Sequence, residues 1–251
     1  MIMNRFQKLL AGALLVIFAL GVPLLANSQD EDRTRTWLQV RTMHVKPDRV
    51  GDFVDLQLKL SEAQKAAGQT GRSMWQEIRG DLATFHSVRS VDNLAELDEP
   101  LERPMGEEEW AAWLSAILDV TDSSTRTILR SHLEWSIPAD EDSEPGLLRL
   151  HYTTVVPSRM GDYHGWIQDQ LLPALKEGGA QGVSFNHTVF GGDSTTWVSG
   201  TRIPNWATLQ RRRGSLAYMS DEDFAALFAP LAEMVTASDV RILRYRADLS
   251  N

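Results

Sequence analysis

The sequence predicts an α+β fold built from two tandem ferredoxin-like units, each with the order strand, helix, strand, strand, helix, strand (βαββαβ). The first observation behind this is a short phrase that occurs twice, at 45–53 and at 156–163. Pro47, Gly51, Asp52 and Phe53 of the first phrase match Pro157, Gly161, Asp162 and Tyr163 of the second, all at one constant offset. The second observation is that both phrases lie in the same succession of strand-like and helix-like patterns. The chain is therefore a duplicated scaffold.

The first copy begins with a strand over 37–45, in which apolar and polar residues alternate. Apolar residues then recur at three- and four-residue steps over 50–67, which predicts an amphipathic helix that ends at Gly68. Two further strands, 73–79 and 84–90, are expected to form a hairpin around Gly80. A second amphipathic helix around 110–117 and a last strand over 126–135 complete this unit.

The second copy repeats this order. Strands are expected over 148–155, 183–190 and 195–201, and the first helix ends at Gly178-Gly179. In the second helix, Phe224, Leu227, Phe228 and Leu231 match the apolar positions of the first copy in phase. The predicted organisation is therefore a ferredoxin-like unit at 36–138, an acidic linker at 139–145 and a second ferredoxin-like unit at 146–249.

Residues 1–28 are typical of a secretory signal peptide. Arg5 and Lys8 precede an uncharged run over 9–26, and cleavage is expected after Ala26 or Ser28. We therefore expect the protein to be exported, either to the periplasm or by secretion. The alternative is an uncleaved N-terminal membrane anchor, because this uncharged run approaches the length that spans a bilayer.

The composition limits the partners. The whole chain has a formal charge of −9, and loss of Arg5 and Lys8 with the segment 1–28 makes the remainder more acidic still. Such a surface disfavours nucleic acid and anionic lipid. We expect no nucleic acid partner and no membrane contact after cleavage, while a homo-oligomer stays open. Because the chain has no cysteine, packing alone must hold the fold together in an oxidising compartment.

The duplicated strand–proline–helix phrase resembles the dimeric α/β-barrel superfamily, which includes antibiotic-biosynthesis-monooxygenase-like, EthD-like and NIPSNAP-like families. The residues that carry the resemblance are Pro47 and Pro157, each followed by a helix with an aromatic residue, Phe53 or Tyr163. The resemblance implies that two ferredoxin-like sheets face one another around a lumen. Here one chain would supply both halves, which makes a pseudo-dimeric α/β barrel.

Strand alternation predicts which side chains face that lumen. If the apolar face of each strand packs on the helices, then Leu38, Leu129 and Leu148 point to the helices and the opposite faces look inward. The inner-face residues predicted to bind a ligand are Arg41, Trp75, Glu77, Arg130, His132, Arg149, His151, Phe185, His187, Arg244 and Arg246. The alternative is that the arginines pair with carboxylates across the sheets and bind nothing. A shift of one residue would invert the assignment.

The resulting hypothesis is an exported small-molecule-binding protein that uses the lumen between the two sheets, with the ligand left open. Aromatic walls and cationic groups suit a small anionic or phenolic molecule. The alternative is an oxygenase- or isomerase-like enzyme of the dimeric α/β-barrel type, either cofactor-independent with an inner-face histidine as general base or haem-dependent.

The residues themselves predict no cofactor, and only the resemblance leaves haem open. No metal site is expected, because the six histidines show no recognised ligand spacing. No catalytic residue is assigned.

Overall fold

The computed structural model describes residues 35–98, 103–139, 146–209 and 213–251. The chain divides into two units, Met1–Arg35 and Thr36–Asn251. Every helix and strand described below lies in the second unit, except that the first strand begins one residue earlier, at Arg35. The predicted signal peptide and nearly all of the predicted linker lie outside the described residues. Within the described residues, no helix has the length and apolar character needed to span a membrane.

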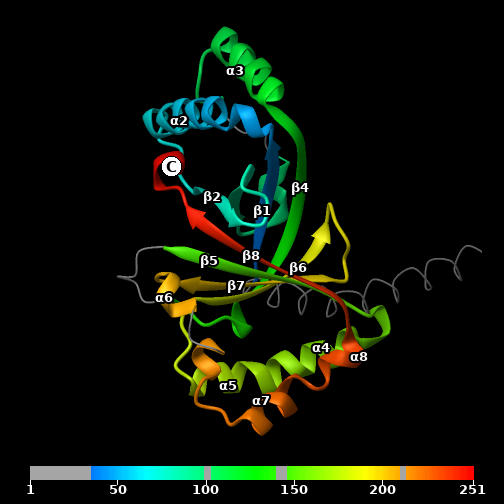
Figure 1. Cartoon of the computed structure of the whole chain (residues 1–251). Coiled ribbons are helices and arrows are strands. Elements are labelled where there is room, and N and C mark those ends of the chain that lie inside the picture. The colour runs from blue at the N-terminus through cyan, green and yellow to red at the C-terminus, as the bar shows by residue number, and fades with distance from the viewer. Residues whose placement is uncertain (1–34, 99–102, 140–145, 210–212) are drawn as a thin grey trace, which may run out of the picture. The chain divides into compact units, whose positions relative to one another are not determined.

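Two repeats with the same order of elements make up the fold (Figure 1). The first contains β1 (Arg35–Val45), α2 (Val50–Ala66), β2 (Arg72–Arg79), β3 (Thr84–Val91), α3 (Glu107–Val120) and β4 (Thr121–His132). The second contains β5 (Leu147–Val155), α4 (Met160–Trp166), α5 (Leu172–Glu177), β6 (Val183–Phe190), β7 (Thr196–Ile203), α6 (Trp206–Leu209), α7 (Asp221–Phe228), α8 (Leu231–Met234) and β8 (Val235–Tyr245). A π-helical turn, Ile167–Leu171, joins α4 to α5. The predicted α+β class with two ferredoxin-like units is confirmed.

The eight strands form one closed barrel in the order β1-β3-β2-β8-β5-β7-β6-β4. Two antiparallel seams join the repeats: β2 pairs with β8, and β4 pairs with β6. At one seam Glu77 lies opposite Leu243, and at the other Thr188 lies opposite Leu129. Each repeat therefore completes the sheet of the other, as expected for a pseudo-dimeric α/β barrel.

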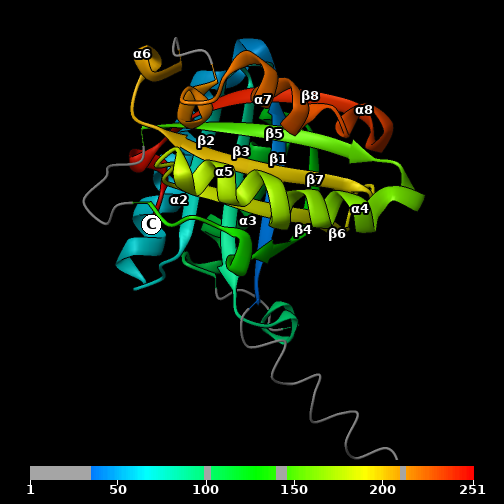
Figure 2. The same ribbon diagram turned by 90° about the horizontal axis from the view of Figure 1, so that it is seen from below.

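Helices cover the barrel on two opposite sides. Figure 1 shows α2 and α3 on one side, and Figure 2 shows α4, α5, α7 and α8 lying across the strands of the second repeat. Each first helix follows a short 3-10 turn that starts at Pro47 or Pro157. Proline suits this place because its fixed φ matches the helix and the first turn needs no N–H.

Each repeat ends by packing into the other repeat's core. The 3-10 turn after β4, Leu133–Trp135, places Trp135 in the core beneath α4 and α5. The corresponding turn after β8, Ala247–Leu249, places Leu249 in the core beneath α2 and α3. Because the last segment of each repeat packs in the core of the other, the cores do not follow the sequence boundaries 36–138 and 146–249, and those boundaries stay predictions.

Candidate functional site

The barrel encloses a cavity of about 540 Å³, which we call the lumen. Its walls are largely apolar side chains from both repeats, which are Leu38, Val40, Trp75, Val88, Leu129, Leu148, Leu150, Val198 and Leu243. Ligand sites in proteins commonly have volumes of roughly 300–1,000 Å³ and predominantly apolar walls. The lumen therefore has the size and the lining of a small-molecule site.

The predicted inner face is inverted on β1 and β5. Leu38 and Leu148 line the lumen, so the alternating residues Arg41, Arg149 and His151 point outward. Arg41 donates to Ser124 and His151 contacts Ser238, at matching places in the two repeats. The physical reason is that the early part of each strand has its apolar side on the lumen. Only the later part, such as Met43, turns an apolar side to the helices.

The assignment is also inverted on β4 and β8, because Leu129 and Leu243 line the lumen. The alternate positions therefore point away from it. The guanidinium of Arg130 lies over the ring of Trp37, and Arg246 binds Asp248 and Gln76. His132 stacks on Trp135 in the helix-side core, and Arg244 is exposed.

On β2 the side chains point as predicted: Trp75 lines the lumen, and Glu77 lies on the same face of the strand. On β6, however, Phe185 and His187 face the helices. Trp75 pairs with His86 and Asn186 pairs with Val198, so the counterpart of Trp75 is Asn186 rather than Phe185. The second repeat has one more residue before β6 than the first repeat has before β2, so the lumen-facing and helix-facing positions of β6 are the reverse of those predicted. Ligand binding by Trp75 and Glu77 stays a prediction.

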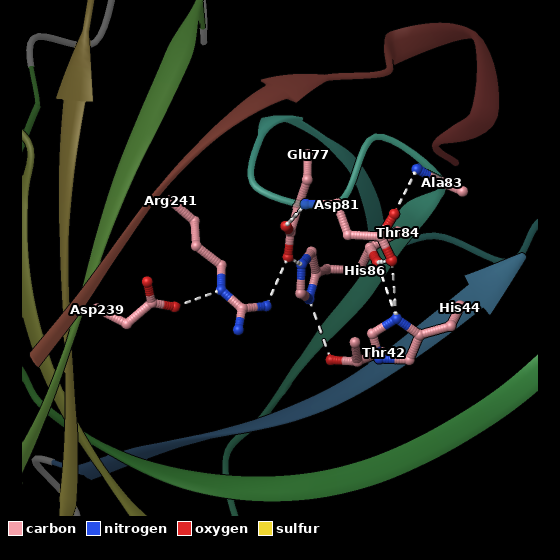
Figure 3. Close-up of polar contacts among 9 residues, drawn as sticks. All are labelled: Thr42, His44, Glu77, Asp81, Ala83, Thr84, His86, Asp239 and Arg241. Atoms are coloured by element: carbon pink, nitrogen blue, oxygen red, sulfur yellow. Dashed lines mark hydrogen bonds and ion pairs between the residues drawn. The ribbon is translucent and has the colours of Figure 1, made fainter. Parts of the chain in front are cut away.

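A chain of polar side chains follows five adjacent strands, and we call it the polar belt: Thr42, His86, Glu77, Arg241 and Tyr152. Glu77 lies between His86 and Arg241 at its centre (Figure 3). The residue is fully buried. Its Oε1 accepts from His86 Nε2 at 2.9 Å and from Arg241 Nη1 at 2.8 Å. His86 Nδ1 lies 3.0 Å from Thr42 Oγ1, and the guanidinium carbon of Arg241 lies 5.2 Å from the ring centre of Tyr152.

Burial and pairing together set the charges of the belt. Burial alone would raise the pKa of Glu77, but hydrogen bonds from His86 and Arg241 bring it below its ordinary value. Burial opposes the charge of Arg241, yet its bonds to Asp239 and Glu77 raise its pKa overall. Burial raises the pKa of Tyr152 to about 12. At neutral pH the belt therefore holds a carboxylate, a guanidinium and a neutral phenol.

The charge of Glu77 fixes the direction of the neighbouring hydrogen bonds. An ionised carboxylate only accepts, so His86 must donate from Nε2. Nδ1 of a neutral His86 is then an acceptor for the hydroxyl of Thr42, which lines the lumen. This arrangement can take a proton from a bound molecule through Thr42 to His86, while Arg241 stabilises negative charge nearby.

The turn after β2 is shaped around Glu77. The β2–β8 register shifts between Glu77 and Arg79, and Gly80 follows with a φ of +122°. A Cβ at Gly80 would collide with Glu77 Oε2, and the same oxygen accepts from the backbone N–H of Asp81 at 3.1 Å. A glycine is required here by both the backbone conformation and the close approach of the carboxylate.

The second repeat does not carry the same chemistry. By the strand pairing, Val198 is the counterpart of His86, and Thr188 is the counterpart of Glu77. Thr127, two positions before the seam residue Leu129, is the counterpart of Arg241. The charged and imidazole groups of the belt therefore occur in one half of the lumen, and small neutral side chains replace them in the other.

A second group of histidines lies outside the lumen, on the helix side of the second repeat. His132 Nε2 lies 2.8 Å from His187 Nδ1, and both rings pack on Trp197. His164 Nε2 is buried without a partner among the described residues, but its ring is packed against Trp135 and Trp197. Two indole rings therefore lie beside it, although the residue as a whole is only partly buried.

These placements test whether haem fits. Within the described ranges, His86 is the histidine that lines the lumen, and both of its ring nitrogens are engaged. His164 lies outside the lumen, and its ring contacts Trp135 and Trp197. Among the described residues, the lumen as arranged therefore offers a haem iron no free imidazole nitrogen. In the described part of the chain no three His, Cys, Asp or Glu side chains are grouped to hold a metal ion.

Sequence reasoning missed His86, Thr42, Tyr152 and Arg241 as site residues. A signal for His86 was present: counting forward from Trp75 across the Gly80 hairpin places His86 directly opposite it. Arg241 comes from the second repeat across a seam, and no local pattern in its own strand indicates that contact.

Comparison with known proteins gives the fold independently. No protein-family model and no curated protein matches the chain. A monooxygenase-like protein from Lactobacillus acidophilus NCFM superposes with a TM-score of 0.55 at 9% identity, over 84% of this chain and 93% of its own. One from Fusobacterium nucleatum gives 0.57 at 13%, over 84% and 92%. An anthrone oxidase-like protein gives 0.56 at 10%, over 85% and 92%.

Identities this low establish shared architecture and leave activity open. The closed eight-stranded barrel, its two repeats and these three structures agree. The chain has a pseudo-dimeric α/β-barrel fold, with both halves supplied by tandem repeats.

Proposed function

We propose that this protein binds a small, largely apolar molecule that carries an acidic hydroxyl group, such as a phenol or an enol, inside the lumen. The observation that carries the proposal is the polar belt on one side of an otherwise apolar cavity of about 540 Å³. An apolar wall alone would suit many hydrophobic molecules. The belt adds a place where one oxygen atom of a ligand is recognised.

The belt offers complementary groups to such an oxygen. Arg241 uses Nε for Asp239 and Nη1 for Glu77, so neither of these contacts occupies Nη2. Tyr152 lines the lumen as a neutral phenol, which can donate a hydrogen bond. The Thr42–His86 pair can accept a proton. A hydroxyl that becomes partly anionic is favoured by this set, because a cation and a proton acceptor are both within the belt.

The test is a fluorescence titration with 1-naphthol of the wild type and two tryptophan variants. Leu150→Trp fills the lumen, while Val240→Trp adds the same side chain at an exposed position of β8. We expect saturable one-to-one binding by the wild type and Val240→Trp, and a loss of at least about tenfold in affinity for Leu150→Trp. Equal binding by a folded Leu150→Trp would place the ligand elsewhere and overturn the proposal.

A second candidate function is proton-transfer catalysis of the oxygenase or isomerase type. It is favoured by one observation: the Glu77–His86–Thr42 chain, in which a buried carboxylate orients an imidazole toward a hydroxyl that lines the lumen. In the first step a C–H bond next to a carbonyl breaks, its proton passes through Thr42 to His86, and its electron pair forms an enolate. Structures described as monooxygenase-like and anthrone oxidase-like share the fold, which is compatible with this candidate.

Proton-transfer catalysis is tested with 2-tetralone in deuterated water, by following loss of its C1 hydrogens with NMR. We expect the wild type to accelerate exchange above buffer, and His86→Gln to abolish the acceleration. Val240→Trp serves as the folded control, because its side chain is outside the belt. Exchange at the buffer rate with the wild type excludes this activity and leaves the binding proposal intact.

We also propose that the protein acts outside the cytoplasm, on the strength of the basic, apolar and small-residue regions within 1–28. Expression of the full chain in a bacterial host, followed by fractionation and intact-mass measurement, tests this. The expected product is periplasmic or secreted and begins after Ala26 or Ser28. A full-length product held in the membrane would support the anchor instead.

A further inference from the structure

Asn186 on β6 carries a buried polar atom that the fold leaves unused. Its side chain lines the lumen, and the residue is only 4% exposed. Nδ2 donates to the backbone carbonyl of Val198 at 3.1 Å and lies 3.4 Å from Ser184 Oγ. A carbonyl can only accept, so this contact fixes which end of the amide is nitrogen. The remaining atom, Oδ1, has no hydrogen-bond partner among the described residues.

An unpaired buried carbonyl oxygen is costly, because folding removed it from water without giving it a donor. Such groups in native proteins need a specific explanation. A purely structural amide would have both ends paired, and an apolar side chain of similar size would fill the same place. Asn186 borders an apolar cavity, but Oδ1 itself is covered in the empty lumen, so a donor brought by a ligand reaches it only when neighbouring side chains move aside.

We propose that Asn186 is a second recognition point of the lumen and accepts a hydrogen bond from a hydroxyl or amino group of the bound molecule. This inference rests on the proposed lumen function and narrows its ligand class. The polar belt lies on β1, β3, β2, β8 and β5, whereas β6 is outside that series in the barrel order. The ligand is therefore a two-headed molecule, with an acidic oxygen at the belt, an apolar body and a hydrogen-bond donor toward Asn186.

The repeat comparison strengthens the assignment. The counterpart of Asn186 in the first repeat is Trp75, which also lines the lumen. The indole of Trp75 packs against Tyr245 at a centroid distance of 5.0 Å and offers an aromatic surface. One position of the repeat thus provides a ring surface in one half and a hydrogen-bond acceptor in the other, which suits a hydroxylated aromatic body.

The experiment compares naphthalenediols with their monomethyl ethers, which keep one hydroxyl and remove the second donor. The 1,5-, 1,6- and 2,6-diols sample different separations between the two oxygens. Affinities are measured by calorimetry for the wild type, Asn186→Leu and Asn205→Leu, the last being the same substitution at an exposed loop residue. We expect the wild type and Asn205→Leu to prefer at least one diol over its ether by about tenfold, and Asn186→Leu to show no preference.

The outcomes separate the two proposals. If the wild type binds diols and ethers equally, or if folded Asn186→Leu keeps the preference, Asn186 is not a recognition point and the lumen proposal survives. If the wild type binds neither compound of any pair, the lumen proposal fails and this inference fails with it. Should Asn186→Leu not fold, the side-chain ¹³Cγ resonance of Asn186 in the wild type decides. It should shift with the preferred diol and not with its ether, and equal shifts would overturn the inference.

Discussion

Replacing Arg241 with methionine should destabilise the protein through Glu77. The Glu77 side chain is 0% exposed and would keep its charge while losing one of the two charge-assisted hydrogen bonds to Oε1. Breaking a buried ion pair typically costs about 3–5 kcal/mol. Because the Arg241 side chain is 33% exposed, solvent screens part of this interaction, and we expect about 2–3 kcal/mol. In a protein of this size that lowers Tm by about 4–12 °C.

The pH dependence gives this prediction a distinct signature. In the wild type the folded pKa of Glu77 lies below its ordinary value of 4.5, so its contribution is present above pH 4.5 and lost as the pH falls through the folded pKa. Without Arg241 the folded pKa of Glu77 rises relative to the wild type, because only the contact with His86 then opposes the effect of burial. The loss of stability therefore grows with pH between the two folded pKa values, and the difference from the wild type should be larger at pH 7.5 than at pH 4.5.

Urea denaturation at these two pH values measures the effect. Arg244→Met is the matched control, since Arg244 is an exposed arginine on the same strand and should change stability by less than about 0.5 kcal/mol. Adding Glu77→Gln to Arg241→Met removes the unpaired charge and should restore part of the loss. A loss under about 0.5 kcal/mol, or one that is the same at both pH values, would refute this account of the belt.

The packing supports three more predictions. Gly80→Ala should lower the free energy of unfolding by about 3 kcal/mol, and Gly71→Ala should lower it by about 1 kcal/mol. Both glycines have a positive φ, but only Gly80 faces Glu77. Equal losses in urea denaturation would contradict the role of the carboxylate. Burial lowers the pKa of His164 below 6.5, so stability should fall as pH drops from about 6.5 toward the folded pKa. His164→Phe should flatten that region of the profile, and an unchanged profile would exclude the effect. Residues 29–140 expressed alone should self-associate in light scattering through the open seam strands; a soluble monomer would oppose the closed-barrel description.

The architecture could be predicted because it rests on local, repeated signals. The turn at Pro47 and its copy at Pro157 mark strand–helix junctions, and apolar periodicity marks the helices that follow. These signals survive duplication, since each repeat must bury a helix face on its own sheet. The element order, and with it the α+β class, followed directly.

The inner face could not be predicted by the same method. Alternation shows that a strand has two unlike faces, but an apolar lumen makes the inward face as hydrophobic as a helix-covered face. On β1 the apolar side changes along the strand, from Leu38 toward the lumen to Met43 toward the helices. A single sequence offset between the repeats also does not align every element. The offset from β2 to the matching residues of β6 is one residue longer than the offset from Pro47 to Pro157.

The unlike halves of the lumen have a consequence that follows from symmetry. In a homodimer with a two-fold axis, every residue that faces a shared cavity occurs twice, so a charge introduced at one wall is also introduced at the other. The tandem chain is free of that constraint. It places Glu77 in the first repeat and Thr188 at the matching position of the second. The two sides of the cavity therefore differ chemically, and this position does not bring in a second buried carboxylate. Under the proposed function, a molecule whose two ends differ would meet unlike walls and would favour one orientation.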